Sequence, residues 1–223
     1  MAGDGTGPGF EVSVSTDTIL RLDLYNREQV LAAPEPRLVR QASVSFGRPT
    51  VHPVRADQFT GLHKLRPDLH RKQFLLVQWP FDLEKLPANR RYESMTVDIE
   101  FDNEAVVALD ILPPAYDAPG PSDDETVRID VRGVGRPRLA WDLCPVDPAC
   151  GLRPRSRVML VILDLPADVV RLTGTLGAKA VVARRRLGRF DTTTAESQTP
   201  APFELGIDGT FAILPSASSG SPV

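Results

Sequence analysis

A run of alternating apolar and polar residues between Gln73 and Pro113 most constrains what this chain can fold into. A period of two lets a β-strand cover a core with one face and meet water with the other. The alternating segment 94–101 is followed by Asp102 and Asn103, which tolerate the backbone of a tight turn, and then by a second alternating segment at 106–112. The stretch therefore predicts a core strand followed by a β-hairpin. The residues expected to face the core on the two arms are Met95, Val97, Ile99, Phe101, Val107, Leu109 and Ile111.

About a dozen such short strand candidates recur along the chain, separated by Pro, Gly and Asp turns. The 21 prolines are about twice the average share, and proline disfavours long helices. We therefore expect an all-β fold, an antiparallel β-sandwich or two small β lobes, with helix confined to short turns. Trp79 and Trp141 lie within or beside strand candidates, so we expect them to pack in the core rather than form an exposed stacking platform.

Polar stretches rich in Gly, Pro and Ser divide the chain. They predict a disordered tail at 1–9, a first β lobe at 10–115, an acidic linker or loop at 116–125, a second β lobe at 126–214 and a disordered tail at 215–223. The linker is the clearest boundary, because it is acidic and has no apolar period.

Charge is distributed unevenly between the two parts. Residues 1–126 carry 13 Lys and Arg against 20 Asp and Glu, a net charge of −7, whereas residues 127–223 carry 13 against 9, a net charge of +4. Such asymmetry has three alternative interpretations. The two parts could attract each other, they could guide head-to-tail assembly of oligomers, or the second part could present a basic surface to an anionic partner.

The basic residues of the second part supply the candidate binding site. In the region 128–189, 13 Lys and Arg face five Asp and Glu. On a strand, Arg184 and Arg186 project to one face and Arg185 to the other, so at least one face is strongly positive. The alternative is a solvated strand end whose arginines reflect a GC-rich coding sequence. The candidate binding residues are Arg184, Arg185, Arg186, Arg189, Arg153, Arg155 and Arg157.

Motifs for catalysis, cofactors or metals are absent from the sequence, so we expect no enzyme activity, no cofactor and no metal site. His52, His63 and His70 lack compact ligand spacing, and we expect them in an exposed loop. Cys144 and Cys150 are expected to be free thiols at a loop, with a small disulfide-closed loop as the alternative. Asp98 and Glu100 share one strand face, which is typical of a solvated face as well as of an acid and base pair.

The function that these features favour is that of a non-catalytic binding or adaptor protein, which engages an acidic protein partner through loops and the basic strand surface. Nucleic acid is disfavoured, because the whole chain is acidic and the cluster lacks interleaved aromatic residues. With no membrane-length apolar run and no signal-peptide pattern at the N-terminus, we expect a cytoplasmic protein without a membrane partner. Two alternatives remain open, a structural subunit of a repeating assembly and a hydrolase whose site is assembled by the fold.

Overall fold

The computed structural model describes residues 17–28, 37–55, 71–116, 127–186 and 188–215. Among these residues thirteen β-strands pair antiparallel with their neighbours, and no α-helix occurs. The prediction of an all-β, antiparallel fold is confirmed.

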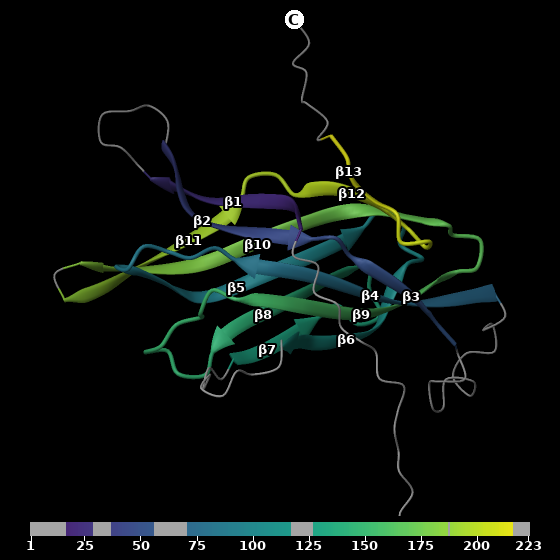
Figure 1. Cartoon of the computed structure of the whole chain (residues 1–223), viewed down its shortest axis with the longest axis horizontal. Helices are drawn as coiled ribbons and strands as arrows, with labels where there is room; N and C mark the ends of the chain where they lie inside the picture. The colour runs from purple at the N-terminus through teal and green to yellow at the C-terminus, as the bar shows by residue number, and fades with distance from the viewer. Residues whose placement is uncertain (1–16, 29–36, 56–70, 117–126, 187, 216–223) are drawn as a thin grey trace, which may run out of the picture.

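The thirteen strands belong to one hydrogen-bonded sheet (Figure 1). In chain order they are β1 (Thr18–Glu28), β2 (Arg37–Gly47), β3 (Thr50–Val54), β4 (Lys72–Leu83), β5 (Arg90–Phe101), β6 (Val107–Tyr116), β7 (Val127–Arg132), β8 (Arg138–Pro145), β9 (Ser156–Pro166), β10 (Arg171–Arg186), β11 (Arg189–Ser197), β12 (Ala201–Gly206) and β13 (Phe211–Ile213). Neighbouring strands follow the order β6-β9-β4-β2-β1-β11-β10-β5-β8-β7, while β3 pairs with β4, β12 with β10, and β13 with β12.

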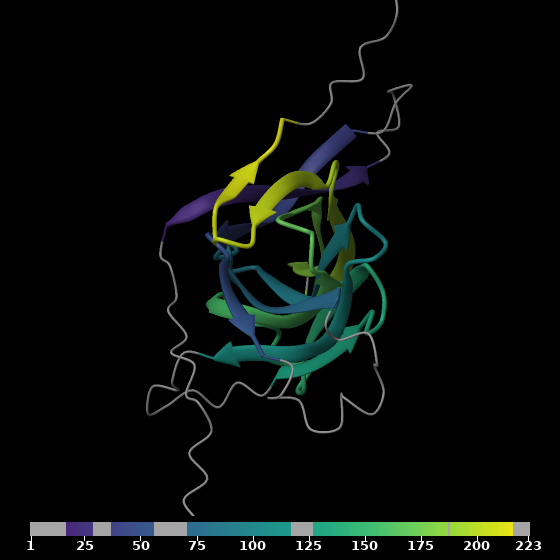
Figure 2. The same ribbon diagram turned by 90° about the vertical axis from the view of Figure 1, so that its right-hand side faces the viewer.

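The sheet curls until its two ends meet, as the end-on view in Figure 2 shows. Ala108 of β6 forms an isolated bridge with Val134, in the turn between β7 and β8. The amide of Gly135 donates to the Ala108 carbonyl at 2.7 Å, and the Ala108 amide donates to the Arg136 carbonyl at 3.1 Å. Instead of two separate sheets, one sheet therefore surrounds one continuous core.

Large aromatic side chains fill this core. Trp79 is 1% exposed and Trp141 is 0% exposed, which confirms the prediction that both tryptophans are core residues. The Trp79 ring meets the edges of Phe203 and Phe211 at centroid distances of 5.2 and 5.8 Å. Aromatic pairs in this edge-on geometry stabilise a core beyond the apolar area that they bury. The contact joins β4 to the β12–β13 extension.

The hairpin predicted over residues 94–112 is wrong in its pairing. A turn does form, in which Asn103 accepts from the Val106 amide at 3.0 Å, but β5 pairs with β8 and β10 whereas β6 pairs with β9. Both edges of β5 are already occupied, so the chain crosses to another part of the sheet. A register shift between Ala108 and Asp110 also changes the side of β6 that faces the core. Val106, Ala108 and Ile111 are buried there, while Val107 and Leu109 are half-buried.

Strands from the two predicted lobes alternate within this sheet. From the second part of the chain, β9 pairs with β4 and β6, while β8 and β10 pair with β5. The acidic and basic parts of the chain therefore share one sheet within one molecule. The predicted tail at 1–9, nearly all of the linker at 116–125 and of the tail at 215–223 lie outside the described residues, so these boundaries stay predictions.

Gly174 and Gly177 on β10 provide a test of how tightly the sheet is packed. A Cβ at Gly174 would lie 2.3 Å from the Glu100 carbonyl oxygen, which is fixed backbone, whereas a Cβ at Gly177 would lie 2.9 Å from the Asp98 carboxylate oxygens, which can move. We expect Gly174→Ala to lower the free energy of unfolding by about 1–3 kcal/mol and Gly177→Ala to lower it less. Urea unfolding measures both values, and equal losses would contradict this account of the packing.

Candidate functional site: an arginine-lined opening between two hairpins

The sheet has a short joint between β1 and β11. Only Leu24 with Ser197 and Tyr25 with Glu196 are partners across it. Beyond these positions β1 continues along β2, and β11 continues along β10 as far as the Arg186 and Arg189 pair at the hairpin end. The β1–β2 and β10–β11 hairpins therefore separate and leave an opening between them.

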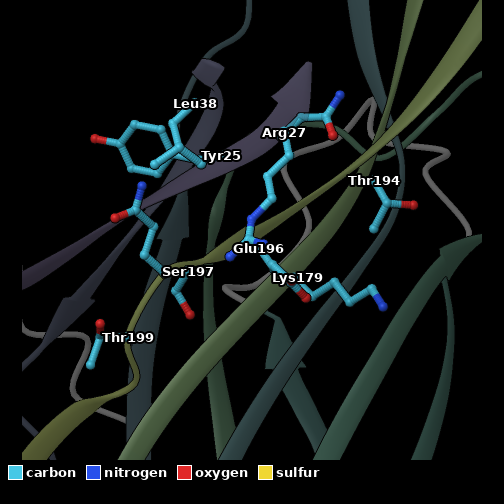
Figure 3. A pocket seen from close by; sticks show the side chains of 10 residues that line it. Tyr25, Arg27, Leu38, Lys179, Thr194, Glu196, Ser197 and Thr199 are labelled. Atoms are coloured by element: carbon cyan, nitrogen blue, oxygen red, sulfur yellow. The ribbon is translucent and has the colours of Figure 1, made fainter. Parts of the chain in front are cut away.

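One face of this opening is a groove with a volume of about 510 Å³, which we call the outer groove (Figure 3). Its residues are Tyr25, Asn26, Arg27, Leu38, Lys179, Thr194, Glu196, Ser197, Gln198 and Thr199. Figure 3 shows Arg27 extending from β1 toward Glu196 on β11. The groove thus combines cations with a carboxylate and with hydroxyl and amide groups, and no single charge dominates it.

The opposite face of the opening holds a cavity of about 250 Å³, which we call the arginine cavity. Its residues are Val39, Gln41, Arg90, Val182, Arg184, Arg186, Asp191 and Thr193. Alternation along β11 separates the two hollows, since Asp191 and Thr193 line the cavity while Thr194 and Glu196 line the groove. Asp191 is the only carboxylate among the described residues that line the cavity.

The pairing register brings like charges together at this cavity. Arg184 lies opposite Arg90 on β5, and Arg186 lies opposite Arg189 on β11. Directly opposite residues of antiparallel strands project to the same face, and like charges in that position destabilise the pair. We call these four residues the arginine face, and in the register of the described strands Asp191, the other partner of Arg184, is the one carboxylate directly opposite any of them.

Two β-bulges create this arrangement. The β5 register shifts between Tyr92 and Ser94, so that Tyr92 and Arg90 face inward. Strict alternation from Met95 would instead place Glu93 on the inward face. The β2 register shifts opposite Leu24 and Tyr25 and leaves Gln41 as the extra residue.

Hydrogen bonds hold the bulged strands in place. Arg90 donates from Nη1 to Gln41 Oε1 at 3.1 Å. The Tyr92 hydroxyl donates to the Glu84 carbonyl at 3.0 Å. Burial, together with the nearby Glu84 carboxylate, raises the pKa of Tyr92 far above its ordinary value, so the hydroxyl remains a donor.

Neighbouring arginines on β1 and β2 are paired with carboxylates, unlike those of the arginine face. Arg21 lies 2.8 Å from Glu84, and Arg40 lies 2.9 Å from Asp23. Burial by itself would raise the pKa of Glu84, but hydrogen bonds from Ser43 and Arg40 outweigh burial and lower that pKa. Among the described residues, in contrast, no carboxylate forms an ion pair with any member of the arginine face.

The candidate binding residues from the sequence are only partly brought together. Arg184, Arg186 and Arg189 share the arginine face, while Arg185 projects to the opposite side as the partner of Phe190. Arg153 is exposed and Arg155 half-buried in the segment before β9.

The prediction that Arg157 belongs to the basic binding surface is wrong. Its side chain is 1% exposed and donates to the carbonyl oxygens of Arg153 and Arg155, at 3.3 and 3.4 Å. It is buried at the start of β9 and therefore contributes nothing to the basic surface.

Sequence reasoning missed Arg90, because the segment 82–91 reads as a covering loop broken by proline. The structure begins β5 at Arg90 and pairs it with Arg184, more than ninety residues further along the chain. The adjacent Arg90 and Arg91 were a local signal of positive charge, but no sequence pattern indicated their partner strand.

The other candidate groups from the sequence are three histidines, two cysteines and the Asp98–Glu100 pair. No cluster of three His, Cys, Asp or Glu side chains occurs among the described residues. Cys144 and Cys150 are free thiols. His52 lies in β3, and His63 and His70 lie outside the described residues. Burial raises the pKa of Asp98, whose carboxylate lies 3.9 Å from the guanidinium of Arg138.

In comparisons with known proteins, no family model and no curated protein matches the chain. Solved structures that resemble it include the Clostridium perfringens NetB toxin in its membrane-inserted form, with 8% identity, a TM-score of 0.39, and coverage of 87% of this chain and 99% of the toxin. A pore-forming protein matches with 8% identity, a TM-score of 0.41, and coverage of 87% and 95%. Clostridium perfringens delta-toxin matches with 8% identity, a TM-score of 0.40, and coverage of 78% and 88%.

These matches contradict the prediction of a cytoplasmic adaptor with an acidic protein partner and no membrane, because the similar structures are pore-forming proteins. We do not retain that prediction. It depended on the absence of a signal-peptide pattern and of a long apolar run, and such absences do not determine a compartment. The described residues likewise contain no helix long and apolar enough to cross a membrane. With 8% identity and TM-scores near 0.4, the likeness itself assigns no function.

The charge arrangement of the arginine face predicts opposite effects for two substitutions. Arg186→Gln removes one member of an Arg–Arg pair, so we expect the free energy of unfolding to rise by about 0.2–1 kcal/mol at low salt. Asp191→Asn removes the nearest carboxylate, and we expect it to lower the free energy of unfolding. Both effects should shrink in 1 M NaCl, where the screening length is about 3 Å. Urea unfolding at two salt concentrations measures them, and a loss of stability in Arg186→Gln would contradict the expected repulsion.

Proposed function

We propose that this chain is a non-catalytic binding protein whose ligand carries a phosphate-like anionic group, held by the arginine face. The observation that carries the proposal is the two cross-strand Arg–Arg pairs, Arg184 with Arg90 and Arg186 with Arg189, since three of these four arginines line one cavity. An anion placed between these side chains would attract each guanidinium group and so offset the repulsion between them.

Guanidinium groups suit this role. Arginine stays protonated and presents a planar set of donors that matches phosphate and carboxylate oxygens in a bidentate manner. The arginine cavity also includes the Thr193 hydroxyl, which supplies a further donor. Phosphate-like groups have enough oxygens to accept from several of these donors at once.

The size of the cavity supports a single charged group rather than a whole cofactor. Sites for drug-sized ligands are typically about 300–1,000 Å³, and the arginine cavity is about 250 Å³. A ligand bound there would place its anionic group between the arginines and leave the rest outside the cavity.

The cavity lining supports binding without catalysis. A reaction needs a nucleophile or a general base near the bound group, and arginines cannot act as bases at neutral pH. Asp191 is the one carboxylate on the cavity wall, and its side chain is exposed. No histidine, cysteine or lysine is among the cavity residues of the described chain.

Phosphate titration of two matched double variants tests this function. We expect inorganic phosphate, compared with chloride at equal ionic strength, to stabilise the parent protein against unfolding, by about 2.7 kcal/mol at a hundredfold excess over Kd. Arg184→Gln with Arg186→Gln should abolish this stabilisation. The control, Arg128→Gln with Arg136→Gln, removes the same charge from exposed positions on β7 and in the β7–β8 turn and should retain it. Equal stabilisation of both double variants would contradict the proposal.

A further inference from the structure

The end of the β10–β11 hairpin has features that binding of a small anion does not require. Phe190 is 45% exposed, although it is a large aromatic side chain. It lies opposite Arg185 on the outer face of the hairpin, while Arg186 and Arg189 occupy the inner face. We call the four residues Arg185, Arg186, Arg189 and Phe190 the hairpin tip.

The Phe190 ring is held in position at its exposed site. The Arg91 guanidinium lies 4.1 Å from the ring centroid, and the same guanidinium lies 2.8 Å from the Glu93 carboxylate. A cation over one aromatic face stabilises the ring at an exposed position. The Arg91 guanidinium therefore covers one face of the Phe190 ring, and the exposed part of the side chain still presents apolar surface to solvent.

The tip also projects from the molecule. In Figure 1 the β10–β11 hairpin extends beyond the neighbouring strands at one end of the long axis. Gly188 has a φ of 81°, a left-handed conformation that closes a tight turn at this end. A flat surface could therefore contact the tip before it meets the rest of the sheet.

We infer that the anionic group recognised by the arginine face is the phosphate of a phospholipid headgroup, and that the hairpin tip lies in the surface of an anionic bilayer. This inference rests on the proposed function. The arginines would contact headgroup phosphates, and the Phe190 ring would enter the boundary between headgroups and acyl chains, where aromatic side chains are favoured. A small cavity that holds only the charged group suits a ligand whose remainder stays in the membrane.

The same residues fit nucleic acid less well. Proteins that bind single strands stack successive bases on several aromatic side chains, and the tip has one aromatic ring with one face covered by Arg91.

Vesicle binding provides the test, with vesicles of phosphatidylcholine alone and of phosphatidylcholine mixed with phosphatidylserine. We expect the parent protein to bind only the mixed vesicles, and to be released by salt. Arg185→Gln with Phe190→Ser should lower the partition coefficient about tenfold, because the variant loses one basic side chain at the anionic surface and one aromatic side chain at the headgroup boundary. Phosphate stabilisation should be unchanged in this variant, because neither residue lines the arginine cavity.

A matched control lies at the other end of the same strand. Val170 is 62% exposed and is followed by Arg171, so Val170→Ser with Arg171→Gln removes one apolar and one basic side chain far from the tip. We expect this variant to bind vesicles like the parent protein. Phe190→Trp should retain binding, and its added tryptophan emission should shift to shorter wavelength on the mixed vesicles.

The outcomes separate the two proposals. Absence of binding to the mixed vesicles, or equal binding by the tip variant and the Val170 control, would overturn the membrane inference while phosphate stabilisation still supports the arginine face as an anion site. Vesicle binding that survives Arg184→Gln with Arg186→Gln would also overturn the membrane inference, whereas phosphate stabilisation that survives in the same variant would overturn the proposed function and the inference that rests on it.

Discussion

The short joint between β1 and β11 is the constraint on which the candidate site depends. Only Tyr25 and Leu24 of β1 have partners on β11, so two hairpins that are each well paired internally are joined over one short stretch. Because the long ladders of β10 with β5 and of β4 with β9 hold the core, the hairpins can diverge without opening it. The Leu24 side chain at the joint is fully buried, while the residues beyond it line hollows on both faces of the sheet.

Sequence patterns predicted the parts of this structure that depend on local alternation. Period-two runs and turn residues identify strands, so the all-β class and the burial of Trp79 and Trp141 could be predicted. The same rule placed Arg184 and Arg186 on one face and Arg185 on the other, as the pairing register of β10 has them. These conclusions need no knowledge of which strands are neighbours.

Features that depend on strand neighbours could not be predicted in this way. A turn at Asn103 shows where the chain reverses, but not that β5 already has a partner on each edge. A bulge changes which side chains of a strand face inward, and it has no local sequence signal. Because of the bulge in β5, Tyr92 and Arg90 face inward and Glu93 does not. Because Arg90 becomes part of the site only through this bulge and through pairing with Arg184, the Arg–Arg contact was invisible in the sequence.

Asp102 and Glu104 lie at the end of the long β5–β10 pair that is remote from the tip, where they are accompanied by Arg138 and Arg171. At the tip end Arg90 is the partner of Arg184, and at the other end Phe101 is the partner of Gly174, next to the exposed Asp102 and Glu104. Sixteen residues of β10 span about 50 Å at roughly 3.3 Å per residue, several times the screening length of about 8 Å at physiological salt. An anionic surface in contact with the tip is therefore screened from the carboxylates at the far end. This separation explains how a chain of net charge −3 could approach such a surface, and it favours one orientation, with the β10–β11 hairpin leading.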